Sequence, residues 1–181
     1  MWHPTMVGMV NDDQLAEVQV PNVQATPEKL ALGAAAELLI ASHIALLGYQ
    51  VYRPLADDRG VDLLVDVGHG RHVAVQVKAV RHTTSSYVYM RKSAFALEPW
   101  MVLALVVYGD SLDDQPQVYF VPATEWSAPR PPLTSYDYVG GKSAPEYGLN
   151  VRKAWRNELE QWSADSDHVH RLMQQAHTGL A

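Results

Sequence analysis

The chain has 181 residues, a net charge of −6 and no cysteine, and 48% of its residues are hydrophobic against 19% charged. This composition is that of one ordinary globular domain, which excludes disorder as the main state. The missing cysteines exclude disulfides and thiolate zinc sites and predict a reducing, cytoplasmic location. The longest apolar run, residues 101–108, is far shorter than the roughly 20 residues of a membrane-spanning helix, so no membrane contact is expected.

The N-terminal part predicts an arm followed by a long helix. Residues 1–25 are polar and mixed, without a clear period, and are expected to form an extended arm. A helix is predicted from Thr26, a hydroxyl N-cap followed by proline, to Leu47, where Gly48 provides a stop. Its leucines and isoleucines spread around most of the circumference, so the helix is expected to pack on more than one surface.

Three strands are expected to follow the helix as a meander. They are predicted at residues 49–55, 61–67 and 72–80, joined by loops rich in glycine and aspartate. The continuous apolar run at 101–108 predicts a central strand, and residues 117–122 predict another.

The remaining segments are shorter or richer in proline. The expected elements are a short helix at residues 93–97, mostly loop at 122–145, an edge strand at 147–151, and helices at 152–162 and 163–177. The chain is accordingly divided into an arm at residues 1–25, one domain at 26–162, and a C-terminal helix and tail at 163–181.

Three polar residues interrupt strands that are otherwise apolar. Asp62 lies in the second predicted strand, and Gln76 and Lys78 lie in the third. Charged groups are almost never fully buried in a sheet unless they are paired or bind a metal. Side chains alternate along a strand, so Gln76 and Lys78 share a face. An antiparallel hairpin through the turn at residues 68–71 would bring Asp62 to them.

The converging groups suit a divalent metal ion. The Asp62 carboxylate, the Gln76 amide oxygen and the main-chain carbonyl of Val77 are ligands of the kind that Mg²⁺ takes. Lys78 would then position or deprotonate a water, or neutralise charge on a phosphate. Glu37 in the first helix is the other carboxylate expected to reach the site from buried structure. A structural ion pair between Asp62 and Lys78, with Gln76 hydrogen-bonded to it, is the alternative.

Two nearby aspartates differ in their suitability as further ligands. Asp66 shares a face with Asp62 but lies about 13 Å away along the strand, too far for the same ion. Asp58 lies in the preceding loop, which can fold back, and is therefore an additional candidate ligand.

The order of Glu37, Asp62 and the segment Gln76-Val77-Lys78 resembles the PD-(D/E)XK nuclease superfamily, which has the restriction-endonuclease-like fold. The likeness is greatest to the Holliday-junction-resolvase-like and Mrr-like branches and to their relatives that carry Gln-x-Lys. It covers about residues 30–162.

This resemblance implies an α/β fold with a central mixed sheet flanked by helices. It also implies a metal-dependent endonuclease that hydrolyses DNA phosphodiester bonds in repair, recombination or defence, frequently as a homodimer. Asp62, Gln76, Val77 and Glu37 would be the metal ligands and Lys78 the catalytic cation. Because Gln76 replaces a carboxylate, affinity for Mg²⁺ is expected to fall, and Mn²⁺ is expected to support activity better.

Basic and aromatic residues near the third strand predict a nucleic-acid surface. Residues 53–92 carry seven basic and four acidic side chains, a local charge of +3 that leaves −9 for the rest of the chain. Aromatic rings stack on bases and cations meet phosphates. The predicted contact residues are Arg81, Tyr87, Tyr89, Arg91 and Lys92. An ordinary amphipathic strand would explain the same cluster.

Two other functions remain open for the whole chain. One is a catalytically inactive module of the nuclease fold that binds nucleic acid or a protein partner. The other is an assembly subunit of a multiprotein defence system, for which the acidic remainder of the surface would face the partner.

Overall fold

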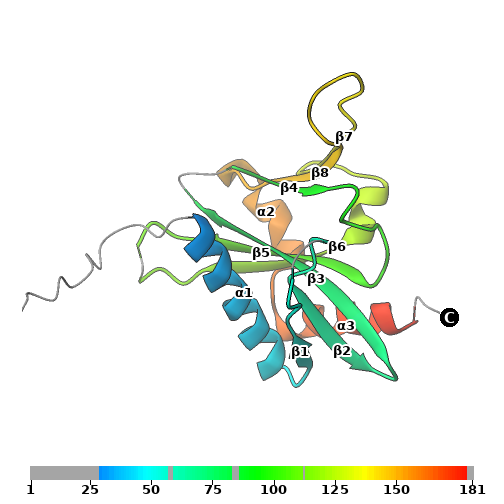
Figure 1. The fold of residues 1–181 in the computed structure, drawn as a ribbon. Coiled ribbons are helices and arrows are strands. Elements are labelled where there is room, and N and C mark those ends of the chain that lie inside the picture. Colours follow the sequence, from blue (N-terminus) through cyan, green and yellow to red (C-terminus); the bar gives the residue numbers. More distant parts are fainter. Residues whose placement is uncertain (1–28, 57–58, 83–85, 112, 179–181) are drawn as a thin grey trace, which may run out of the picture.

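An 11-residue strand, β3 (Arg71–Arg81), runs through the middle of the structure and carries Gln76, Val77 and Lys78 (Figure 1). The computed structural model describes residues 29–56, 59–82, 86–111 and 113–178. The predicted arm at residues 1–25, the predicted helix start at Thr26 and the candidate ligand Asp58 lie outside these residues.

The main sheet has five strands in the order β1-β2-β3-β5-β6. Their bounds are β1 Gln50–Tyr52, β2 Leu63–Gly68, β3 Arg71–Arg81, β5 Met101–Tyr108 and β6 Gln117–Pro122. β3 and β5 are parallel and the other neighbours are antiparallel, so the sheet is mixed. The predicted meander and the predicted central strand are both confirmed. β5 is buried along almost its whole length, as a continuous apolar run requires.

A smaller antiparallel sheet covers one face of the main sheet. Its strands, in spatial order, are β4 Tyr87–Arg91, β8 Glu146–Asn150 and β7 Leu133–Tyr136. The prediction that the segment at 147–151 is an edge strand is wrong, because β8 is the middle strand. β7 was expected to be loop. Its four residues bury only Leu133, which leaves too little pattern to reveal a strand.

Two helices cover the opposite face of the main sheet: α1 Lys29–Leu46 and α3 Ser166–Thr178. The buried side of α1 is a single stripe spaced four residues apart, consisting of Leu32, Ala36, Ile40 and Ile44. The expectation that this helix packs on more than one surface is wrong, since Leu30 and Leu46 are each 86% exposed. Gly48, with φ +92°, ends the helix as predicted.

By length and composition alone, α1 could also cross a membrane, because its mean hydropathy is 1.5 over 18 residues. It is longer than residues 101–108, the apolar run on which the prediction of no membrane span rests. In the structure, Ala36, Ile40 and Ile44 of α1 pack in one core cluster with Leu63 and Val75 of the main sheet.

Short helical segments connect the strands in the second half of the chain. They are η2 Ala123–Ser127, η3 Lys153–Trp155, α2 Arg156–Leu159 and η4 Glu160–Trp162. The last three replace the single helix predicted at residues 152–162, and Leu159 and Trp162 are buried between the two sheets. The helix predicted at residues 93–97 is wrong: this segment is a turn followed by irregular chain, and Phe95 packs edge-on against Trp126.

The predicted α/β architecture, a central mixed sheet flanked by helices, is confirmed. α3, which the predicted division separates at residue 163, contributes Val169, Leu172 and Met173 to the same core as α1. One face of β3 is therefore sealed by helices, while the face that carries Gln76 and Lys78 looks toward the second sheet.

Candidate active site

The β2–β3 hairpin places Asp62 on the same face as Gln76 and Lys78. Leu63 pairs with Val75 in the antiparallel register, and the Asp62 N–H donates to the Val75 carbonyl at 3.0 Å. Leu63 and Val75 both face the helices. Because side chains alternate, their neighbours Asp62 and Gln76 face the other way. The predicted hairpin is thus confirmed, and it brings the three polar residues to one face of the sheet, near the middle of β3.

The Asp62 carboxylate is bound to the backbone of β3. Its Oδ2 accepts a hydrogen bond of 2.5 Å from the Val77 N–H. The N–H and C=O of one strand residue point to the same side of the strand. The Val77 carbonyl therefore also points toward Asp62. It lies past Val75, the β3 residue that pairs with Leu63 at the start of β2.

Gln76 is 6% exposed, and its amide oxygen Oε1 has no hydrogen-bond partner in the part of the chain that the structure describes. A buried polar atom without a partner is costly, so its presence calls for an explanation such as a bound ion or water. The Asp62 carboxylate, the Val77 carbonyl and the Gln76 amide oxygen together form a set of hard oxygen donors. This donor set fits Mg²⁺ or Mn²⁺.

Among the described residues, Glu37, the other carboxylate predicted for this site, is not part of that set. Glu37 forms an ion pair with Arg53, which follows β1, and it does not line the pocket that contains Gln76 and Lys78. Glu37 could therefore bind the metal ion only after its ion pair with Arg53 had broken. Across residues 29–56, 59–82, 86–111 and 113–178, no group of three or more histidine or acidic side chains could hold a metal. The amide and carbonyl oxygens are thus essential to the predicted site.

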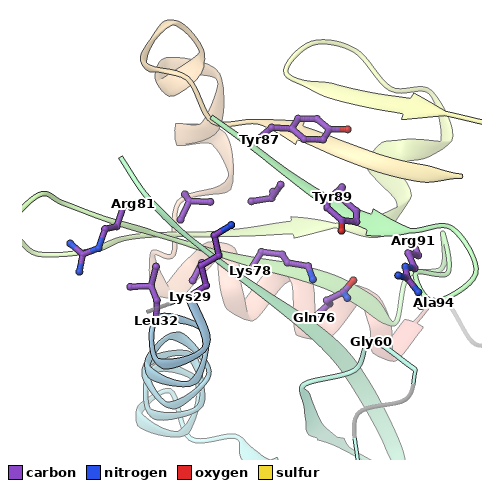
Figure 2. A pocket seen from close by; sticks show the side chains of 13 residues that line it. Lys29, Leu32, Gly60, Gln76, Lys78, Arg81, Tyr87, Tyr89, Arg91 and Ala94 are labelled. Carbon is purple, nitrogen blue, oxygen red and sulfur yellow. The ribbon is translucent and has the colours of Figure 1, made fainter. Parts of the chain in front are cut away.

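A pocket of about 550 Å³ opens beside Gln76 and Lys78, between β3, β4 and the first turn of α1 (Figure 2). We call it the Lys78 pocket. Its described lining contains no carboxylate but four cations: Lys29, Lys78, Arg81 and Arg91. Gln76 and Lys78 project into it from β3, opposite Tyr89 and Arg91 on β4. A cavity lined by charges of one sign concentrates counter-ions, so this pocket favours phosphate although the chain is acidic overall.

The five residues predicted to contact nucleic acid fall into two groups. Tyr89 and Arg91 are exposed and line the Lys78 pocket. Arg81 is 8% exposed, donates to the Gly109 carbonyl at 3.3 Å and points away from Lys78 (Figure 2). The sequence pattern cannot separate these groups, because hydrogen-bond partners come from distant segments.

Lys92 and Tyr87 are likewise engaged within the protein. The Lys92 ammonium donates to Asp137 at 2.6 Å and lies 4.9 Å from the centre of the Tyr147 ring. The Tyr87 hydroxyl donates to Glu146 at 2.9 Å, and burial raises the pKa of Tyr87 to about 12. The hydroxyl therefore stays protonated as a donor across the neutral range.

Removing the Tyr87 hydroxyl is expected to affect stability. Tyr87→Phe should lower the free energy of unfolding by about 1 kcal/mol, the usual net value of a hydrogen bond. The matched change Tyr89→Phe, at a ring that is 50% exposed, should shift it by less than about 0.5 kcal/mol. Urea denaturation measures both, and equal losses would contradict the structural role assigned to Tyr87.

Lys29 and Gly60 are site residues that the sequence argument missed. Lys29 reaches the pocket because α1 packs against β3, a tertiary contact without a local signal. The sequence places Gly60 at the end of the loop that leads into the strand of Asp62 and indicates no contact with Gln76. Its φ is +68°, and a Cβ at this position would lie 2.9 Å from Gln76 Nε2 and 3.3 Å from Ala94 Cβ. Glycine thus allows the chain to pass close to the Gln76 amide.

This contact predicts a specific difference between two glycines. Gly60→Ala and Gly70→Ala both place alanine at a positive φ, and both should cost about 1 kcal/mol or more. Only at Gly60 does the new methyl group meet Gln76, since no atom lies within 4 Å of a Cβ at Gly70. Gly60→Ala is expected to be less stable than Gly70→Ala by about 1 kcal/mol. Denaturation curves of the two variants measure this difference. Equal free energies of unfolding would mean that the Gln76 side chain moves aside for the new methyl group at no cost.

Comparison with known proteins gives a fold but no sequence family. No protein family and no curated protein matches the chain. Among solved structures, it is similar to the bacterial homing endonuclease I-Ssp6803I, with a TM-score of 0.52 and 17% identity, covering 86% of this chain and 99% of that one. A second similar structure is Hjc, a Holliday junction resolvase of Archaeoglobus fulgidus, with a TM-score of 0.40, 10% identity, and coverage of 65% and 83%. The chain therefore has the fold of the homing endonuclease.

Proposed function

We propose that this protein is a metal-dependent endonuclease that hydrolyses DNA phosphodiester bonds in repair, recombination or defence. The observation that carries the proposal is the position of Asp62, Gln76 and Lys78 on one face of the β2–β3 hairpin, with Gln76 and Lys78 in the basic Lys78 pocket. The fold shared with a homing endonuclease supports it.

Each residue of the site has a separate role in this proposal. The oxygens of Asp62, Gln76 and Val77 would hold Mg²⁺ or Mn²⁺, which when bound supplies Lewis-acid polarisation of a phosphate oxygen. The Lys78 ammonium would neutralise the negative charge that develops on the phosphate as the bond breaks. Arg91, at the β4 wall, would hold the DNA backbone in the pocket.

Glu37 and Asp58 have less direct support. Glu37 becomes a ligand only if Arg53 releases it, and that ion pair lies at the exposed surface, where such pairs contribute little. Asp58 adjoins the described segment that begins at Arg59 and Gly60. Either carboxylate would add the negative charge that the neutral Gln76 does not supply.

Nicking of supercoiled plasmid tests the function. The wild-type protein is expected to nick DNA with Mn²⁺ or Mg²⁺ and to stop when EDTA is added. Gln76→Glu adds a negative charge to the ligand set and is expected to lower the metal concentration for half-maximal cleavage about tenfold. Titration of each metal against the nicking rate measures the shift.

The same assay identifies the alternative function. If the wild type and Gln76→Glu both bind DNA without cleaving it, the protein is a catalytically inactive module that binds nucleic acid. Cleavage that persists in EDTA would contradict the proposed metal dependence.

A further inference from the structure

A second pocket, of about 580 Å³, adjoins the Lys78 pocket on the same face of the main sheet. We call it the Trp100 pocket. The two pockets share Arg91 and Ala94 in their linings. Gly60, which lines the Lys78 pocket, lies beside Ala94, since a Cβ at Gly60 would be 3.3 Å from the Ala94 Cβ. A ligand in the Trp100 pocket would therefore lie directly beside the Lys78 pocket.

The Trp100 pocket has an apolar floor and a cationic rim. The floor includes the buried residues Ala74 and Met101 and the partly buried Trp100. Arg59 and Arg91 are exposed at the opening, and no carboxylate occurs among the described lining residues. An apolar, aromatic surface accepts the face of a nucleobase, and cations accept the attached phosphates.

The shape of the pocket restricts the ligand further. Its volume lies within the roughly 300–1,000 Å³ of typical small-molecule sites, which suits one nucleotide. A paired base is stacked inside the duplex, so only a base outside the stack can enter a concave pocket. We propose that the Trp100 pocket binds one unpaired nucleotide of the strand that is cut. The substrate class is then DNA with an unpaired nucleotide beside the scissile phosphate. This inference rests on the proposed endonuclease function.

Bulged DNA tests the inference. A duplex with one central unpaired 2-aminopurine is compared with the fully paired duplex, in EDTA so that neither is cut. The wild type is expected to bind the bulged duplex about tenfold more tightly, as measured by fluorescence anisotropy. The fluorescence of the 2-aminopurine is expected to fall on binding, because the base stacks on Trp100.

A variant that fills the pocket provides the second readout. Ala96→Phe adds a ring to the lining without removing a cation. The ratio of the two affinities is expected to fall below about twofold. The matched control is Ala31→Phe, the same change on the exposed surface of α1, which should keep the wild-type ratio.

The outcomes separate this inference from the proposed function. Equal affinity of the wild type for both duplexes, or unchanged 2-aminopurine fluorescence, overturns the inference, whether or not Ala96→Phe folds. Displacement of bulged DNA by deoxyadenosine monophosphate at comparable affinity would reveal a free-nucleotide site and also overturn it. In each of these cases, plasmid nicking would still support the endonuclease. A wild type that binds neither duplex and does not nick plasmid in Mg²⁺ or Mn²⁺ removes both.

Discussion

Asp62→Asn is expected to lower the rate of DNA cleavage about 1,000-fold while leaving the fold in place. The asparagine oxygen can still accept the hydrogen bond that Asp62 receives from the Val77 N–H, so stability should change by less than about 1 kcal/mol. The charge, however, is lost. Asp62 is the single carboxylate of the proposed donor set, so its charge is expected to be needed for metal binding. A bound metal ion stabilises the transition state by several kcal/mol, and about 1.4 kcal/mol corresponds to a factor of ten in rate.

Asp66→Asn is the matched control for this change. Asp66 lies four residues further along the chain, in β2, where it pairs with His72, and its carboxylate also accepts a backbone hydrogen bond, from the Gly68 N–H at 2.7 Å. The two variants thus lose the same charge from similar surroundings. Nicking rates and thermal unfolding of both are compared in Mn²⁺. Full activity of Asp62→Asn, or an equal loss in Asp66→Asn, would contradict the proposed metal site.

The convergence of the polar residues was predictable because strands have a period of two. Once Gly68 and Gly70 mark the turn, the alternation of valines fixes which side of β3 carries Gln76 and Lys78. The register then follows from matching the apolar residues of β2 to those of β3. No distant contact is needed for this step.

Partners from distant segments were not predictable in the same way. The Glu37 carboxylate appeared suited to the site because it stands alone in an apolar helix, but Arg53 lies within its reach in the folded chain. Tyr87 appeared to be a stacking residue until β8 supplied Glu146 as its hydrogen-bond acceptor. Such side-chain pairs depend on which segments the fold brings together. The chemical type of one residue carries no information about its partner.

The exposed leucines of α1 reveal a related limit of the sequence argument. An apolar residue on a helix indicates that burial is favourable, but it does not show which face meets the sheet. Here the stripe through Ala36 and Ile40 packs inward, and Leu38 is left exposed. Exposed apolar residues are common on folded proteins, so hydrophobic character alone could not assign the faces.

Lys78→Met is expected to reduce the cleavage rate at saturating DNA by about 100- to 1,000-fold. Methionine keeps most of the length of the side chain but removes the charge that would stabilise the phosphate in the transition state. DNA binding should weaken much less, because Lys29 and the exposed Arg91 remain in the pocket lining. The expected result is therefore a lower kcat with a modest change in KM.

Lys29→Met makes the same chemical change in the same pocket, but on α1 and away from Gln76. It is expected to raise KM and to flatten the salt dependence of DNA binding, as the loss of a phosphate contact would. Lys78→Arg, which retains the charge, should recover part of the rate. Steady-state kinetics of the three variants at several salt concentrations distinguish the roles. If Lys78→Met behaved like Lys29→Met, Lys78 would only contact the DNA backbone, and the case for catalysis on this face of β3 would rest on Asp62 alone.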